Sequence, residues 1–268
     1  MPTFAHAGAD IYYELAGEAG PPVLLLTGFA VGGGVWEHQV AALAPDHRVA
    51  CLDNRGAGRT RAKTSPWTIR DMAQDALALL DHLGWDRAHV CGASMGGMIA
   101  QEVALAARDR LLSLTLIATH AGRPADKQPR WHTLSGFLRS NIGSKDARRE
   151  AIEALLFSAD YLATAPREPI DRALERDFLV QPPLPDRLAQ LGAILRHDTA
   201  RRLPTLAGLP TLIIVADEDR LLPPSGCAAL GALIPGAEVV HLPAGHGVIG
   251  ERKEAVNAAL RAHLGRIP

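Results

Sequence analysis

The sequence predicts an α/β fold with a mostly parallel sheet, and alternation, length and composition are the observations behind this prediction. Short apolar runs alternate with segments of helical periodicity along most of the 268 residues. Such alternation is typical of parallel strands that are joined by helices covering both faces of the sheet. An apolar fraction of 47% and a charged fraction of 21% are those of an ordinary globular protein. We therefore expect one large domain with a lobe inserted into it.

The chain is expected to begin with a hairpin, made by residues 3–7 and 11–17 around a turn at Gly8. Further apolar runs follow, each apolar on both faces, as a strand covered by helices on each side requires. These runs are 22–28, 47–53, 88–93, 111–119, 210–216 and 237–243. Together with the hairpin they predict a mostly parallel sheet of eight strands.

Helical periodicity appears between and after these runs. Helices are predicted over 35–44, 68–84, 95–108, 224–233 and 251–264. The segment 68–84 is the best defined, because its apolar residues recur at steps of three and four. Thr68 and Asp71 predict a capping box at its start, and Gly84 predicts its end.

One long stretch breaks the alternation, between the sixth and seventh predicted strands. Residues 121–203 show helical patterns and prolines but no convincing strand. We therefore predict a helical cap over 121–203, inserted into a core made of 1–120 and 204–268. The cap holds five of the twelve aromatic residues, namely Trp131, Phe137, Phe157, Tyr161 and Phe178.

Charge and cysteine content argue against several classes of protein. With 28 basic and 29 acidic residues, the chain has no charge excess suited to nucleic acid or an anionic membrane. No apolar run is long enough to span a bilayer, and the first residues lack a secretory signal pattern. We therefore expect a cytoplasmic protein that binds neither nucleic acid nor membrane. The oligomeric state is left open, a homo-oligomer included. Cys51, Cys91 and Cys227 are too few and too scattered for a disulfide framework or zinc site. Cys51 and Cys91 lie in apolar runs, so core packing is expected for these two.

Ser94 lies between the predicted strand 88–93 and the predicted helix 95–108, with Gly92 and Gly96 on either side. A tight strand-to-helix turn would force this serine into a strained conformation with its hydroxyl projecting. The glycines would leave room for the neighbouring strand and helix. The N–H of Met95 would then lie at a helix N-terminus, where a developing oxyanion is stabilised. A lone serine between glycines is a weak signal, so its partners decide the interpretation.

A serine nucleophile needs a base, and the base needs an orienting carboxylate. His246 directly follows the predicted strand 237–243 and has a glycine on each side. The other histidines have ordinary structural interpretations, and His263 is assigned to a helix surface. Asp219 is preferred over Asp217 as the acid, because it lies one turn beyond the strand end and can reach His246. Asp217 is expected to hydrogen-bond within the turn.

The order of Ser94, Asp219 and His246 along the chain resembles that of the α/β-hydrolase family. The resemblance is to the branch with a helical cap, which includes bacterial esterases, enol-lactonases and cofactor-free haloperoxidases. It rests on the elbow at 92–96, the loop 52–60, the acid turn 215–223 and the histidine loop 243–260, each at a strand end. A serine at the elbow is unlike the haloalkane dehalogenases and epoxide hydrolases, which carry aspartate there.

The resemblance implies that the main-chain N–H groups of Phe29 and Met95 form an oxyanion hole. Thr27 stands where these proteins often carry a histidine before Gly28, so the question arises how the loop 28–36 is braced. Asp53, Asn54 and Arg55 are expected to form a hydrogen-bonded cluster that stabilises a turn.

The expected function is a carboxylesterase that acts through an acyl-enzyme on a small-molecule ester or lactone, with no metal or organic cofactor. An apolar roof is expected over the site, although the cap aromatics could equally form the cap's own core.

Substrate contacts are predicted for Gly28, Trp131, Phe137, Phe157 and Tyr161. Arg123, Arg130 and Arg139 are candidates for binding a substrate carboxylate. Enol-lactone hydrolysis, perhydrolysis and carbon–carbon bond hydrolysis remain open, as does a ligand-binding receptor without turnover.

Overall fold

The computed structural model describes residues 2–63, 65–122 and 144–267. Its strands form one sheet in the order β1-β2-β4-β3-β6-β7-β8-β9. The pairs β1–β2 and β2–β4 are antiparallel, and all pairs from β4 to β9 are parallel. The predicted sheet is therefore confirmed, and a short strand, β5, that pairs with β2 was not predicted. The strands are β1 (Thr3–His6), β2 (Ala9–Ala16), β3 (Pro22–Leu26), β4 (Arg48–Leu52), β5 (Arg61–Ala62), β6 (Ala88–Ala93), β7 (Leu111–Ile117), β8 (Thr211–Ala216) and β9 (Glu238–Leu242).

Helices cover both faces of the sheet and bury two separate cores. Along β3, Leu24 and Leu26 point into one core, whereas Val23 and Leu25 point into the other. This alternation explains why the central strands are apolar on both faces. The first core includes α2 (Ile69–His82) and α3 (Met95–Ala106), and the second includes α1 (Glu37–Leu43) and α12 (Lys253–Leu264). The predicted capping box of α2 is present.

Three sequence expectations differ from the structure. β9 is largely exposed rather than covered on both faces, because it is the edge strand of the sheet and no further strand lies beyond it. The predicted helix 224–233 is two short helices, α9 (Pro224–Ala228) and α10 (Leu230–Leu233). His263 is only 3% exposed, because α12 packs this face against the second core rather than toward solvent.

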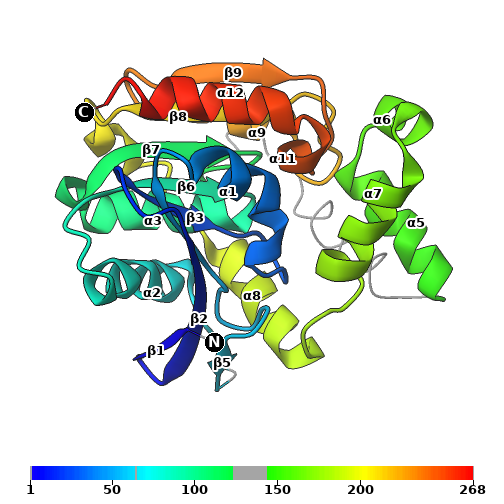
Figure 1. Ribbon diagram of the computed structural model, residues 1–268, viewed down its shortest axis with the longest axis horizontal. Coiled ribbons are helices and arrows are strands. Elements are labelled where there is room, and N and C mark those ends of the chain that lie inside the picture. Colours follow the sequence, from blue (N-terminus) through cyan, green and yellow to red (C-terminus); the bar gives the residue numbers. More distant parts are fainter. Residues whose placement is uncertain (1, 64, 123–143, 268) are drawn as a thin grey trace.

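The described chain between β7 and β8 is helical, as predicted for the insertion. Its helices α5 to α8 are here called the cap. In Figure 1, α5, α6 and α7 lie to one side of the sheet, whereas α8 lies closer to it. α5, α6 and α7 share a small apolar core of their own, whereas Ala193 of α8 is buried in the first core of the sheet. The bounds are α5 (Lys145–Leu156), α6 (Ala159–Thr164), α7 (Arg167–Ala173) with the π-helical turn η3 (Leu174–Phe178), and α8 (Leu184–Arg196).

Shorter helical turns complete the described chain. They are η1 (Gly33–Trp36), η2 (Arg108–Arg110), η4 (Leu203–Leu206) and α11 (Val248–Glu251). Across the described ranges, every helix is too short or too polar to cross a membrane.

Candidate active site

Ser94 occupies a strained turn between β6 and α3. Its φ of 57° and ψ of −123° lie outside the regions that L-residues favour. The N–H of Ser94 donates to the carbonyl of Ile117 (2.9 Å), and Thr119 Oγ1 donates to the carbonyl of Ser94 (2.8 Å), so β7 and the residues after it hold the turn. A β-carbon on Gly96 would lie 2.0 Å from the carbonyl oxygen of Leu26. Glycine is therefore required there for close packing against β3, as the sequence indicated.

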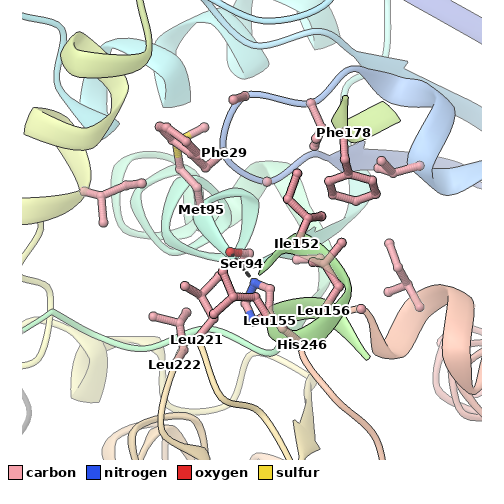
Figure 2. Close-up of a pocket in the computed structure, with 18 of the residues that line it drawn as sticks. Phe29, Ser94, Met95, Ile152, Leu155, Leu156, Phe178, Leu221, Leu222 and His246 are labelled. Carbon is pink, nitrogen blue, oxygen red and sulfur yellow. Dashed lines mark hydrogen bonds between the residues drawn. The ribbon is translucent and has the colours of Figure 1, made fainter. Parts of the chain in front are cut away.

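The structure brings the three predicted side chains into contact in series. Nε2 of His246 lies 2.9 Å from Oγ of Ser94, and Nδ1 of His246 lies 2.6 Å from Oδ2 of Asp219 (Figure 2). The imidazole and the carboxylate are nearly buried, at 7% and 2% side-chain exposure. Because a carboxylate only accepts hydrogen bonds, the proton of neutral His246 resides on Nδ1. Nε2 is then the acceptor that faces the serine hydroxyl.

The two aspartates of the acid turn have different partners, and the side chain of Asp217 pairs outside the turn rather than within it as expected. Oδ1 of Asp219 accepts the N–H groups of Leu221 and Leu222, both at 2.8 Å, which leaves Oδ2 for His246. Asp217 instead contacts His241 on the surface, at 2.7 Å with 43% of its side chain exposed. Two backbone donors therefore fix the orientation of the Asp219 carboxylate.

The loop 28–36 is held next to Ser94 by polar side chains of the core. A β-carbon on Gly28 would lie 3.4 Å from Cβ of Ser94, so the backbone of this loop runs beside the hydroxyl. Asn54 donates to both the carbonyl (3.0 Å) and the hydroxyl (2.9 Å) of Thr27. Oδ1 of Asp53 accepts the N–H of Gly33 at 2.7 Å. These bonds confirm the hydrogen-bonded cluster at Asp53 and Asn54 and show what braces the loop.

The cap holds the loop that carries His246. The N–H of Gly247 donates to the carbonyl of Leu156 at the end of α5, at 2.6 Å. Oε2 of the buried Glu251 accepts the N–H groups of Gly245 and Ser158, both at 3.0 Å. Its Oε1 accepts the hydroxyl of Ser158 at 2.5 Å. One carboxylate therefore joins the histidine loop to the start of α6, a contact that sequence reasoning missed.

The α/β hydrolase fold model matches residues 21–253. This chain belongs to the α/β hydrolase fold family. Over 98% of both chains it is 32% identical to "Putative carbamate hydrolase RutD" of Azorhizobium caulinodans.

Solved structures extend the likeness over nearly the whole hydrolase chain. An enol-lactonase from Burkholderia xenovorans is 29% identical with a TM-score of 0.86, covering 98% of this chain and 100% of the other. A thermophilic esterase from Thermogutta terrifontis is 30% identical with a TM-score of 0.83, covering 98% and 96%. The chain is thus similar to hydrolases named for different substrates.

A mostly apolar cavity of about 190 Å³ opens beside Ser94 in this α/β hydrolase. Gly28, Phe29 and Met95 line it together with Ser94 and His246. The cap contributes an apolar wall, visible in Figure 2, that includes Ile152, Leu155, Leu156 and Phe178. The site therefore pairs a polar reactive wall with an apolar one.

The predicted substrate contacts are only partly found at this cavity. Gly28 lines it, but Phe157 and Tyr161 do not. Their rings lie 5.5 Å apart and pack in the core of the cap, because the inward faces of α5 and α6 meet there. Trp131, Phe137 and the three arginines Arg123, Arg130 and Arg139 lie outside the described residues.

Buried groups around the site are held neutral. Burial lowers the pKa of His120 to about 4, against an opposing influence of the Asp219 charge, so this ring is uncharged at neutral pH. Nδ1 of His120 accepts the N–H of Gly122 at 2.9 Å.

Burial also raises the pKa of the Cys51 and Cys91 thiols, which makes both unreactive and agrees with their predicted place in the core.

Proposed function

We propose that this chain is a carboxylesterase, which cleaves esters of small to medium apolar substrates through an acyl-enzyme. The observation that carries the proposal is the hydrogen-bonded series Ser94, His246 and Asp219 at the wall of an apolar cavity. An alcohol, an imidazole and a carboxylate in series is the arrangement that nucleophilic acyl transfer requires.

In the proposed reaction, Nε2 of His246 takes the proton of the Ser94 hydroxyl as Oγ attacks the ester carbonyl carbon. Asp219 keeps the proton on Nδ1 and stabilises the imidazolium that forms. The imidazolium gives its proton to the departing alkoxide, which leaves as an alcohol while the acyl group stays on Ser94. The imidazole then takes a proton from a water molecule as the water oxygen attacks the acyl carbon. The bond from that carbon to Oγ of Ser94 breaks, the imidazolium returns the proton to Oγ, and the carboxylic acid leaves.

The main-chain N–H groups of Phe29 and Met95 are the proposed donors to the oxyanion. Met95 is the first residue of α3, where the helix dipole favours negative charge. Phe29 follows Gly28, whose backbone approaches Ser94 closely. In other enzymes, the loss of one oxyanion donor costs about 2.7–4 kcal/mol of transition-state stabilisation.

The size and apolar character of the cavity support a short alkyl or aryl group as the part of the substrate that it binds. An apolar cavity of about 150 Å³ in another protein holds benzene, so about six carbons fit into the 190 Å³ found here. The similarity to an esterase at 30% identity agrees with this proposal. Enol-lactone hydrolysis is the second candidate, because the enol-lactonase shares this fold at a TM-score of 0.86 and a lactone is a cyclic ester.

The test is hydrolysis of 4-nitrophenyl acetate, butyrate and octanoate, assayed beside a panel of lactones. We expect steady turnover of the short esters by the wild type and its complete loss in Ser94→Ala. Ser225→Ala is the matched control, because Ser225 is an exposed serine in α9 and should leave turnover unchanged.

Full activity of a folded Ser94→Ala variant would refute the proposal. A preference for enol-lactones over every open-chain ester would favour the second candidate. A single burst of nitrophenol without further turnover would instead favour a ligand-binding receptor on this scaffold.

A further inference from the structure

Gln190 is a buried glutamine in the middle of the cap helix α8, and it took no part in the sequence predictions. Its side chain is fully buried, although α8 also carries the cavity-lining residues Leu191 and Ile194. A buried amide is costly unless its hydrogen bonds are satisfied, so its partners indicate what it does.

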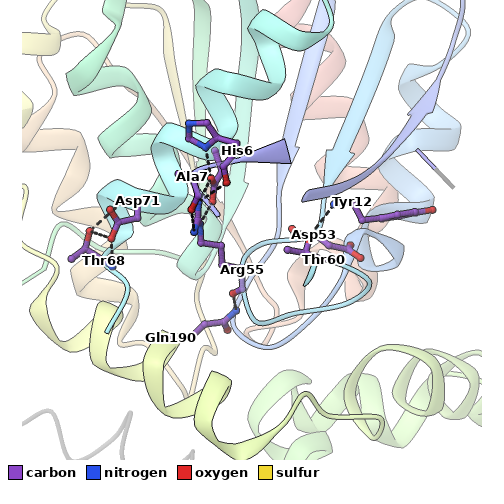
Figure 3. A network of polar contacts seen from close by, with 10 residues as sticks. His6, Ala7, Tyr12, Asp53, Arg55, Thr60, Thr68, Asp71 and Gln190 are labelled. Carbon is purple, nitrogen blue, oxygen red and sulfur yellow. Dashed lines mark hydrogen bonds and ion pairs between the residues drawn. The ribbon is translucent and has the colours of Figure 1, made fainter. Parts of the chain in front are cut away.

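Both ends of the Gln190 amide are hydrogen-bonded to backbone of the core. Oε1 accepts the N–H of Ala30 at 2.8 Å. Nε2 donates to the carbonyl of Arg55 at 2.6 Å, a contact drawn in Figure 3. An N–H group only donates and this carbonyl only accepts, so the two partners fix the orientation of the amide. The side chain therefore links the loop 28–36 to the loop after β4.

The Arg55 end of this link is firmly anchored. The Arg55 guanidinium forms a two-bond ion pair with the buried Asp75, at 2.5 and 2.7 Å. It also donates to the carbonyls of His6 and Ala7, each at 3.2 Å, as Figure 3 shows. Paired donors and acceptors of this kind hold a guanidinium in one position. The amide of Gln190 is therefore bonded, at this end, to a residue whose position is fixed.

The Ala30 end lies where the geometry of the oxyanion donor is set. Ala30 has a φ of 60°, a left-handed conformation that a non-glycine residue adopts only when its surroundings enforce it. Its N–H belongs to the same rigid peptide plane as the carbonyl of Phe29. A bond to this N–H therefore limits the rotation of the backbone on the carboxyl side of Phe29.

We propose that Gln190 is a positioning residue for the oxyanion hole, through which cap helix α8 holds the Phe29 backbone at the angle that catalysis requires. The inference rests on the proposed hydrolysis and adds the cap to its machinery. Core side chains hold the loop at Thr27 and Gly33, and Gln190 holds it between them. Gln190 touches neither the serine nor the reacting atoms, so it acts through Ala30.

Gln190→Met is the test variant, because methionine keeps the length and packing of the side chain and removes both hydrogen bonds. Gln101→Met is the matched control. Gln101 is equally buried and also makes two bonds, donating to the carbonyl of His120 (3.1 Å) and accepting from the Thr199 hydroxyl (2.6 Å), away from the loop 28–36.

Three readouts are compared: kcat and KM for 4-nitrophenyl butyrate, the inhibition constant of an alkyl trifluoromethyl ketone, and the thermal unfolding midpoint. A trifluoromethyl ketone forms a hemiketal oxyanion with the serine, so its binding reports on the hole directly. We expect Gln190→Met to lower kcat by about 10- to 100-fold and to weaken the ketone in proportion, because a misplaced donor loses part of its effect. KM should change little.

The control should lower the unfolding midpoint to a similar degree while kcat and ketone binding stay within about threefold. Equal losses of kcat in the two variants, or unchanged ketone binding in Gln190→Met, would overturn the inference.

A fluorophosphonate that labels Ser94 separates this inference from the proposed function, because labelling needs the hole but no particular ester. Slower labelling of Gln190→Met with no ester turnover in the wild type would refute the esterase and keep the role of Gln190. If the wild type hydrolyses esters and Gln190→Met is labelled at the same rate as the wild type, the esterase proposal stands and the role of Gln190 is refuted.

Discussion

Asp219 performs two tasks with its two carboxylate oxygens, and this division makes one substitution informative. Oδ1 accepts the N–H groups of Leu221 and Leu222, and Oδ2 faces Nδ1 of His246. In Asp219→Asn, the two backbone donors would hold the amide oxygen at the Oδ1 position. The amide NH₂ would then face Nδ1 and force the imidazole proton onto Nε2, which removes the base from Ser94.

We therefore expect Asp219→Asn to fold normally and to lose about 10⁴-fold in kcat, the effect of this change in a serine protease. Asp217→Asn is the control, because the exposed side chain of Asp217 pairs with the surface residue His241. This variant should keep kcat within about twofold. Steady-state kinetics on one ester measures both variants. Comparable losses of kcat in the two variants would contradict the assignment of Asp219 as the acid.

At the scale of elements, α11 and α6 meet at Glu251. This carboxylate is 4% exposed and satisfies the N–H of Gly245, the N–H of Ser158 and the hydroxyl of Ser158. Because Gly245 precedes His246, the bond joins the position of the base to the position of the cap. The reactive serine and its base are thus each held by different elements.

Glu251→Ala should lower the free energy of unfolding by at least about 2 kcal/mol, because it leaves buried donors without a partner. It should also lower kcat by about 10-fold, since a loosened histidine loop spends less time in register with Ser94. Glu254→Ala, at a side chain 82% exposed in the next helix, is the control for both measurements. Urea unfolding and ester kinetics provide the readouts, and a stability loss without any loss in kcat would limit Glu251 to a structural role.

At the scale of the whole molecule, buried histidines are expected to make the free energy of unfolding depend on pH in the acidic range. Burial, followed by the charges of His47 and His263, lowers the pKa of His89 to about 4. Burial likewise lowers the pKa of His197 to about 4. Below pH 6.5 the unfolded chain binds protons on these rings that the folded chain does not bind. The free energy of unfolding should therefore fall as the pH drops from about 6.5 to 4.

Each such histidine contributes a slope of at most about 1.4 kcal/mol per pH unit within this window. His89→Gln should flatten the dependence of unfolding free energy on pH between 7.5 and 4.5. His38→Gln, at a side chain 38% exposed, should leave the slope unchanged. Urea unfolding across this range measures both, and parallel curves for wild type and His89→Gln would contradict the assignment.

The residues that are predictable from the sequence are those whose signal is local. The elbow at Ser94 and the capping box at Thr68 each occupy a few consecutive residues. Asp219 and His246 were found because each follows a strand closely, and the carboxyl ends of parallel strands meet at one edge of a sheet. Gln190 had no such signal, since its partners lie 160 and 135 residues away along the chain.

The local sequence pattern likewise did not predict which side chains become buried where two elements pack together. Phe157 and Tyr161 carry aromatic rings, as the cavity-lining Phe178 does, and only the packing of α5 against α6 places their rings in the core of the cap. His263 was assigned to the surface because periodicity alone does not reveal which face of a final helix is covered.

The sequence by itself determined the α/β alternation, the helical insertion and the order of serine, acid and histidine, because strand period, helix period and turn chemistry act between near neighbours. Only the tertiary structure decided which side chains brace the loop 28–36, which residues face the cavity and how the cap is joined to His246. Hydrogen bonds between distant segments depend on where whole elements pack, and that packing is a property of the complete fold.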